Sequence, residues 1–190
     1  MFKVLPDRFR LYVLLCLNCG FTQGDLATLR KDELRLKEGR IVRQRAKTRR
    51  HPNPPTVNYK LWPKTLRLLK NHISEHPDLV FLTRRRTPLI VSKMVTRTDG
   101  NHHVRYDTVC RTYGKLRRKH AELPDKSLKF LRKTGSTKLR GETQYMALDQ
   151  LYLGHSHKTI ADKHYNAFDG EPYSPLDEAI TWLGKELGVK

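Results

Sequence analysis

The sequence has few cysteines, no long apolar run and no leader pattern at its N-terminus. Its three cysteines are Cys16, Cys19 and Cys110, and the C-x-x-C pair formed by the first two has no second pair to complete a zinc site. We therefore expect buried thiols in a reducing compartment and no bound metal. No stretch is long and apolar enough to cross a bilayer, and residues 1–7 lack the segments of a signal peptide. These absences predict a soluble, cytoplasmic protein with no membrane partner.

Acidic residues are also scarce relative to basic ones. The 38 Lys and Arg residues face only 19 Asp and Glu residues, which gives a formal charge of +19 and a pI near 10.1. A field of this sign attracts polyanions, and nucleic acid is the first candidate. The charge is also compatible with a basic surface for solubility or with a ribosome-associated protein. An anionic membrane surface is a weaker rival because no purely basic amphipathic helix is present.

Hydrophobic residues make up 37% of the 190 positions, enough for one sizeable core and one domain. The periodicity predicts a mainly α, α+β fold with one small antiparallel sheet. Helices are expected over residues 8–19, 22–30, 63–75, 107–119, 127–139, 142–151 and 175–187, and strands over 34–37, 41–47 and 56–61. Residues 92–103 show no clear periodicity, and we expect an exposed turn at Asp99-Gly100-Asn101.

One short stretch combines a histidine and a tyrosine. His155 follows a glycine turn at Gly154, and Tyr165 comes after a short polar segment. A His and a Tyr so placed can lie near one anionic group, with the tyrosine as nucleophile and the imidazole as donor. An isolated pair of this kind is also compatible with an ordinary surface loop, so its meaning depends on the residues that precede it.

Two groups of basic residues precede that pair. Arg43, Arg45 and Lys47 alternate along the predicted strand 41–47, so all three can point from one face of the sheet. Lys129 and Arg132 stand three residues apart on a predicted helix and share a side of it. An arginine on the inner face of an apolar helix needs an anionic partner.

The order and spacing of these segments resemble the catalytic domain of the tyrosine recombinases, also called the phage integrase family. The resemblance extends over about residues 8–170, and its most specific part is Leu153-Gly154-His155-Ser156 with a following Lys-Thr-Ile and a tyrosine. It implies a mostly helical catalytic domain with a small antiparallel sheet. It also implies site-specific cleavage and rejoining of double-stranded DNA through a 3′-phosphotyrosyl intermediate, without a metal or nucleotide cofactor.

The resemblance assigns five catalytic residues. Tyr165 is the nucleophile, Arg132 and His155 each hold a non-bridging oxygen, and Lys47 protonates the departing 5′ oxygen. Lys129 stands where the family has a histidine, and lysine can also donate to phosphate. Cationic donors recur in such sites because transesterification at a phosphodiester builds charge on the non-bridging oxygens.

Five further residues are expected to contact DNA, and one of them replaces a family arginine. That arginine follows a helix-ending glycine, but here Gly20-Phe21 is followed by Thr22. Thr22 can offer a hydroxyl and helix N-terminal amides to a phosphate oxygen, or an arginine of the strand can reach across. Alternatively Thr22 only caps its helix, and the chain is a DNA-binding module that has lost its chemistry. The expected DNA-contacting residues are Thr22, Arg43, Arg45, Arg49 and His157.

The resemblance also divides the chain into a catalytic domain, residues 1–174, and a C-terminal amphipathic helix, residues 175–190. In the family this helix tends to pass to a neighbouring subunit. We therefore expect the stripe of Leu176, Ile180, Leu183 and Leu187 to pack in trans. The expected partners are double-stranded DNA and further copies of the chain in a tetramer, with a nucleoid-associated location.

Overall fold

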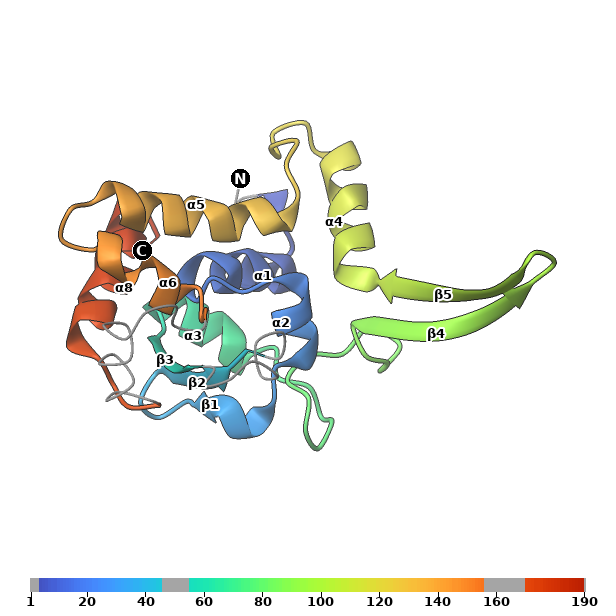
Figure 1. The fold of residues 1–190 in the computed structure, drawn as a ribbon, viewed down its shortest axis with the longest axis horizontal. Coiled ribbons are helices and arrows are strands. Elements are labelled where there is room, and N and C mark those ends of the chain that lie inside the picture. Colours follow the sequence, from blue (N-terminus) through green and yellow to red (C-terminus); the bar gives the residue numbers. More distant parts are fainter. Residues whose placement is uncertain (1–3, 46–54, 156–169, 190) are drawn as a thin grey trace.

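The structure is a computed structural model that describes residues 4–45, 55–155 and 170–189. It has the mixed helix and sheet architecture that the sequence predicts (Figure 1). The helices are α1 (Asp7–Asn18), α2 (Gln23–Thr28), α3 (Pro63–Lys70), α4 (Thr108–Lys119), α5 (Leu128–Gly141), α6 (Asp149–Tyr152) and α8 (Ser174–Glu186), with short 3-10 turns η2 (Lys31–Glu33) and η3 (Met146–Leu148). The strands are β1 (Leu34–Arg35), β2 (Arg40–Gln44), β3 (Thr56–Lys60), β4 (Ile90–Arg97) and β5 (Gly100–Asp107). Within these residues no helix has the length and apolarity to span a bilayer.

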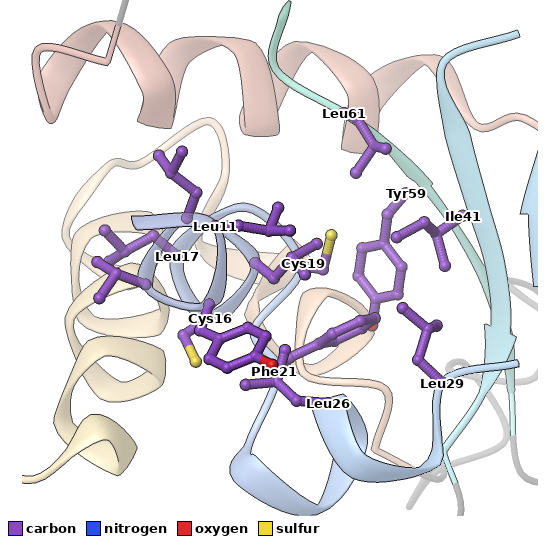
Figure 2. Close-up of a cluster of buried hydrophobic side chains, with 14 of the residues drawn as sticks. Leu11, Cys16, Leu17, Cys19, Phe21, Leu26, Leu29, Ile41, Tyr59 and Leu61 are labelled. Carbon is purple, nitrogen blue, oxygen red and sulfur yellow. The ribbon is translucent and has the colours of Figure 1, made fainter. Parts of the chain in front are cut away.

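Helix α1 forms the centre of the core because it is apolar on nearly every side. Its residues from Leu11 to Asn18 are all buried, and it packs against α3, α5 and α8. Figure 2 shows Ile41 and Tyr59 of the sheet facing Cys19 and Phe21 across this core. The predicted burial of Cys16 and Cys19 is confirmed, and burial raises the pKa of the Cys16 thiol to about 12. Both thiols are therefore held neutral and serve as packing groups.

A three-stranded antiparallel sheet lies beside this helix, in the order β1-β2-β3. Ile41 pairs with Tyr59, and both side chains are buried, so this row of the sheet closes the core. The opposite rows carry polar residues such as Arg40 and Asn58, which hydrogen-bond to each other at 2.7 Å. Alternation thus places Ile41 and Tyr59 on the face toward the core, and Arg40 and Asn58 on the other face of the sheet.

Helix α8 packs on its own chain in this structure, and the expected trans packing of this segment stays a prediction. Leu176, Ile180 and Leu183 are at most 1% exposed and lie against the rest of the core. Asp177 forms a bidentate ion pair with Arg40 of β2 at 2.8–2.9 Å. The apolar side chains of α8 are thus buried within the chain, where β3 and α5 cover them.

Two segments differ from the sequence predictions. Residues 92–103 belong to a long hairpin of β4 and β5, joined near Asp99 and Gly100, where only the turn was expected. The hairpin was missed because both of its faces are largely exposed, which leaves no alternation of apolar and polar residues to detect. The helix expected over 142–151 is also wrong, since only η3 and the four-residue α6 form there.

The contact between α5 and α6 leads to a stability prediction. A Cβ at Gly135 of α5 would clash with the hydroxyl of Tyr152, which donates to the carbonyl of Leu17 at 2.6 Å. We expect Gly135→Ala to lower the free energy of unfolding by about 1–3 kcal/mol, since a packed core does not absorb an added methyl group. Gly114→Ala is the matched control, because nothing lies within 4 Å of its Cβ and alanine favours the α4 helix by about 0.5–1 kcal/mol. Urea titrations of both variants measure the difference, and equal effects would contradict it.

Candidate functional site

Arg132 lies on the inner face of α5 and is only 8% exposed. Its guanidinium donates to the carbonyl oxygen of Gly20, to that of Leu153 at 2.8 Å, and to Nε2 of His155 at 3.0 Å. All three acceptors are neutral, and Arg132 forms no ion pair with a carboxylate of the described residues. Burial and the nearby charge of Arg45 lower the pKa of Arg132. A buried guanidinium in this state is stabilised by an added anion.

The turn Leu153-Gly154-His155 ends α6 with paired backbone hydrogen bonds. The His155 amide donates to the Gln150 carbonyl at 3.0 Å, and the Gly154 amide donates to the Leu151 carbonyl at 2.8 Å. Gly154 has φ of +59°, which a residue with a side chain adopts only with strain. The predicted glycine turn is therefore confirmed, and it orients both the Leu153 carbonyl and the His155 ring toward Arg132.

The hydrogen bonds of His155 define its tautomer. Its Nε2 accepts a hydrogen bond from Arg132, which can only donate, so this nitrogen carries the lone pair. Its Nδ1 lies 2.9 Å from the amide oxygen of Gln150 and therefore carries the hydrogen. Gln150 was not among the residues predicted from the sequence, and no local pattern marks it. The two partners hold the imidazole ring beside the Arg132 guanidinium.

Arg45 reaches the same place from the end of β2. It donates to the Leu153 carbonyl at 3.2 Å, the oxygen that Arg132 also uses, and it pairs with Asp25 at 3.3 Å. A Cβ at Gly154 would lie 2.8 Å from Cδ of Arg45, so glycine at this position also gives the arginine its room. Residues 45, 132 and 153 thus meet at one carbonyl although they lie far apart in the sequence.

Thr22 is occupied as a helix cap. Its amide and hydroxyl donate to Asp25 at 2.8 and 2.7 Å, and the Asp25 amide returns a bond at 3.3 Å. The predicted capping box is confirmed, and the expectation that Thr22 offers its hydroxyl to a ligand is corrected, since that hydroxyl is turned to Asp25. Burial acts to raise the pKa of Asp25, but the Arg45 charge and the bonds from Thr22 outweigh it and leave the pKa lowered.

These contacts bring together a buried excess of positive charge among the described residues. Arg45 and Arg132 place two guanidinium groups at the Leu153 carbonyl, while Asp25 brings one carboxylate. His155 adds a neutral ring with hydrogen-bonding nitrogens at the same place. We call Asp25, Arg45, Arg132 and His155 the arginine cluster. Asp25 was not predicted as a site residue, although its capping signal was visible in the sequence.

Two other predicted residues lie away from the cluster. Arg43 is 2% exposed and pairs with Glu33 at 2.7 Å, while its other nitrogen donates to Thr28 at 2.6 Å. The expected basic strand face open to DNA is therefore wrong for Arg43, which is enclosed by the protein. Lys129 is exposed on α5, whereas Arg132 three residues later is buried. Lys129 makes no hydrogen bond or ion pair with a described residue, so the structure does not bring it to the arginine cluster.

Four predicted residues lie outside the described residues. They are Lys47, Arg49, His157 and Tyr165. Lys47 follows Arg45 by two residues, and Tyr165 follows His155 by ten. Across residues 4–45, 55–155 and 170–189, no group of three or more His, Cys, Asp or Glu side chains is arranged to hold a metal ion.

Comparisons with known proteins identify the fold. No protein-family model and no curated protein sequence matches the chain. Among solved structures, the XerA recombinase is similar with a TM-score of 0.55 and 18% identity, over 93% of this chain and 58% of that one. The Tn1549 transposon integrase bound to circular intermediate DNA gives 0.53 and 14%, over 85% and 59%. A variant of that integrase bound to transposon right-end DNA gives 0.55 and 13%, over 84% and 57%. The chain thus has the fold of tyrosine recombinase catalytic domains and spans less than two thirds of these chains.

Proposed function

We propose that this chain, built on the fold of tyrosine recombinase catalytic domains, cleaves and rejoins double-stranded DNA. The observation that supports this most is the arginine cluster, where two buried guanidinium groups meet at one carbonyl beside the Asp25 carboxylate. A phosphodiester is the anion that a strongly basic protein meets on DNA, and it would balance this charge. The DNA-bound state of the Tn1549 integrase structures agrees with a nucleic-acid substrate.

The reaction follows from the residue types. The Tyr165 hydroxyl loses its proton to solvent as its oxygen attacks the phosphorus atom, a 3′-phosphotyrosyl bond forms, and the bond to the 5′ oxygen breaks. Lys47 gives a proton to that departing oxygen, which becomes a 5′ hydroxyl. Arg132 and Arg45 stabilise the charge that develops on the non-bridging oxygens, and His155 positions the Arg132 guanidinium through its Nε2. Attack by the 5′ hydroxyl of the same or another strand reverses these steps and rejoins the DNA.

Arg45 takes the role of the arginine that the family places at position 22. Both positions adjoin the same carboxylate, since Asp25 bonds Thr22 at 2.7 Å and Arg45 at 3.3 Å. The Arg45 guanidinium, which comes from the end of β2, thus reaches the region beside Asp25. An arginine at position 22, at the start of α2, would otherwise fill that region. This exchange accounts for the absence of arginine at position 22 without loss of a donor.

A suicide DNA substrate tests the proposal. Such a duplex carries a nick next to the cleaved phosphate, so the short 5′ product diffuses away and religation stops. We expect denaturing gels to show a covalent protein–DNA adduct, with the DNA attached to the peptide that contains Tyr165. DNA binding with no adduct on a substrate that carries the target site would instead favour a binding module without chemistry, in which Thr22 is only a cap.

A further inference from the structure

The hairpin of β4 and β5 is a two-stranded ribbon that extends away from the rest of the molecule (Figure 1). Its eight cross-strand pairs run from Ile90 opposite Asp107 to Arg97 opposite Gly100. No third strand joins this sheet among the described residues, and nearly all of its side chains are at least partly exposed. A two-stranded ribbon is marginal in water unless something packs on it or binds it.

The two faces of the ribbon differ in composition. Because side chains alternate along a strand, the pairing places most of the apolar residues on one face, together with Lys93 and His102, whereas Ile90 and Met94 lie on the other face. Side chains of that face partly cover one another. Val91 lies opposite Tyr106, and the Lys93 amine lies 5.5 Å from the centre of the Tyr106 ring. The residues of this face, from Val91 to Val95 with their partners, are Val91, Lys93, Val95, His102, Val104 and Tyr106.

The other face carries mainly hydrogen-bonding side chains, and all of its residues are exposed apart from the half-buried pair of Ile90 and Asp107 at its base. Its exposed pairs are Ser92 with Arg105, Met94 with His103, and Thr96 with Asn101. The Thr96 hydroxyl donates to the Asn101 side-chain oxygen at 2.7 Å, which leaves the Asn101 NH₂ group directed to solvent as a donor. Arg105 has no hydrogen-bond or ion-pair partner in the described part of the chain. We call these six residues the polar face.

The ribbon lies within a basic segment of the chain. Residues 84–119 contain eleven Lys and Arg residues against Asp99 and Asp107, a formal charge of +9 out of +19 for the whole chain. Most of this charge flanks the ribbon, since residues 90–107 themselves carry three Lys and Arg against the two Asp. In α4, which follows β5 directly, Arg111, Lys115 and Arg118 are exposed and recur at the spacing of one helix face. Charge of this density beside the ribbon favours a polyanion over a protein partner.

We infer that the polar face of the β4–β5 ribbon is a second DNA-binding surface that enters the major groove, while α4 holds the adjacent phosphates. The B-DNA major groove admits a two-stranded ribbon, whereas that of an RNA duplex is too deep and narrow. Arginine, asparagine, serine and threonine are also the side chains that read base edges there. The inference rests on the proposed action on DNA and adds where the duplex is held, away from the arginine cluster.

Two exposed cations at the same distance along the ribbon provide a matched test. Arg105 lies opposite Ser92 on the polar face. Lys93 follows Ser92 in the sequence and points from the other face of the ribbon. The Arg105→Gln and Lys93→Gln variants of the full chain lose the same charge, and both should melt at the wild-type temperature. Binding to a short fluorescein-labelled DNA duplex of mixed sequence is followed by anisotropy. We expect Arg105→Gln to weaken binding by about tenfold, and Lys93→Gln to leave it unchanged.

A second duplex separates groove contact from phosphate contact. Glucosylated 5-hydroxymethylcytosine fills the major groove but leaves every phosphate in place. It should weaken binding of the wild-type chain and have no further effect on Arg105→Gln. Equal losses in the two variants, or equal binding of both duplexes by the wild type, would overturn the ribbon inference alone. No binding of the wild type to any duplex would overturn the proposed function as well.

Discussion

The Tyr165→Phe variant should form no covalent adduct with a suicide DNA substrate, while it binds the same DNA as tightly as the wild type. The phenolic oxygen is the atom that bonds to phosphorus, and phenylalanine has nothing to replace it. Binding is unchanged because the guanidinium groups and the basic surfaces that attract DNA remain. Gel electrophoresis under denaturing conditions measures the adduct, and anisotropy measures the binding.

Tyr145→Phe is the control for this result. Tyr145 packs against Trp182 with ring centroids 5.4 Å apart, and the same loss of one hydroxyl there should leave the adduct yield unchanged. An adduct that persists in Tyr165→Phe would place the nucleophile elsewhere and contradict the assignment. Loss of the adduct in both variants would indicate a general effect on folding, which thermal melting reveals.

The second large effect concerns Arg45. We expect Arg45→Gln to slow adduct formation by about 10²–10³-fold, the usual loss when one preorganised donor to a developing oxyanion is removed. The Thr22→Arg/Arg45→Gln double variant should recover much of this rate, because position 22 touches the same Asp25 carboxylate. Thr22→Arg alone should bring no gain, since Arg45 already supplies the donor. Single-turnover rates on the suicide substrate measure all three variants.

Arg40→Gln separates this effect from a loss of stability. Arg40 is also buried on β2, and it pairs with Asp177 of α8 as Arg45 pairs with Asp25. Breaking either buried pair is expected to lower the free energy of unfolding by about 3–5 kcal/mol, so both variants are assayed where circular dichroism shows them folded. Only Arg45→Gln should slow cleavage. A gain of rate in Thr22→Arg alone would mean that Arg45 does not fill the missing role.

Much of the fold was predictable because its signals are local. Gly20 ends α1, Thr22 and Asp25 cap α2, and Gly154 terminates α6, each through contacts within a few residues. The continuous apolar run of α1 and the apolar stripe of α8 likewise report burial directly. The hairpin of β4 and β5 escaped detection for the same reason, because a ribbon without a buried face leaves no such pattern.

The sequence by itself determined most of the helices, the caps at Thr22 and Gly154, the small sheet, the basic character, and Arg132 and His155 as candidate site residues. Alternation along the strand cannot distinguish Arg43 from Arg45, since both lie on the same side of it. Only the tertiary structure decided that the two side chains, which both turn inward, pair with different carboxylates. Arg43 is neutralised by Glu33, whereas Arg45 meets Arg132 at the Leu153 carbonyl. The physical reason is that alternation gives the side of a strand on which a residue lies, while its partner can come from a segment more than 100 residues away.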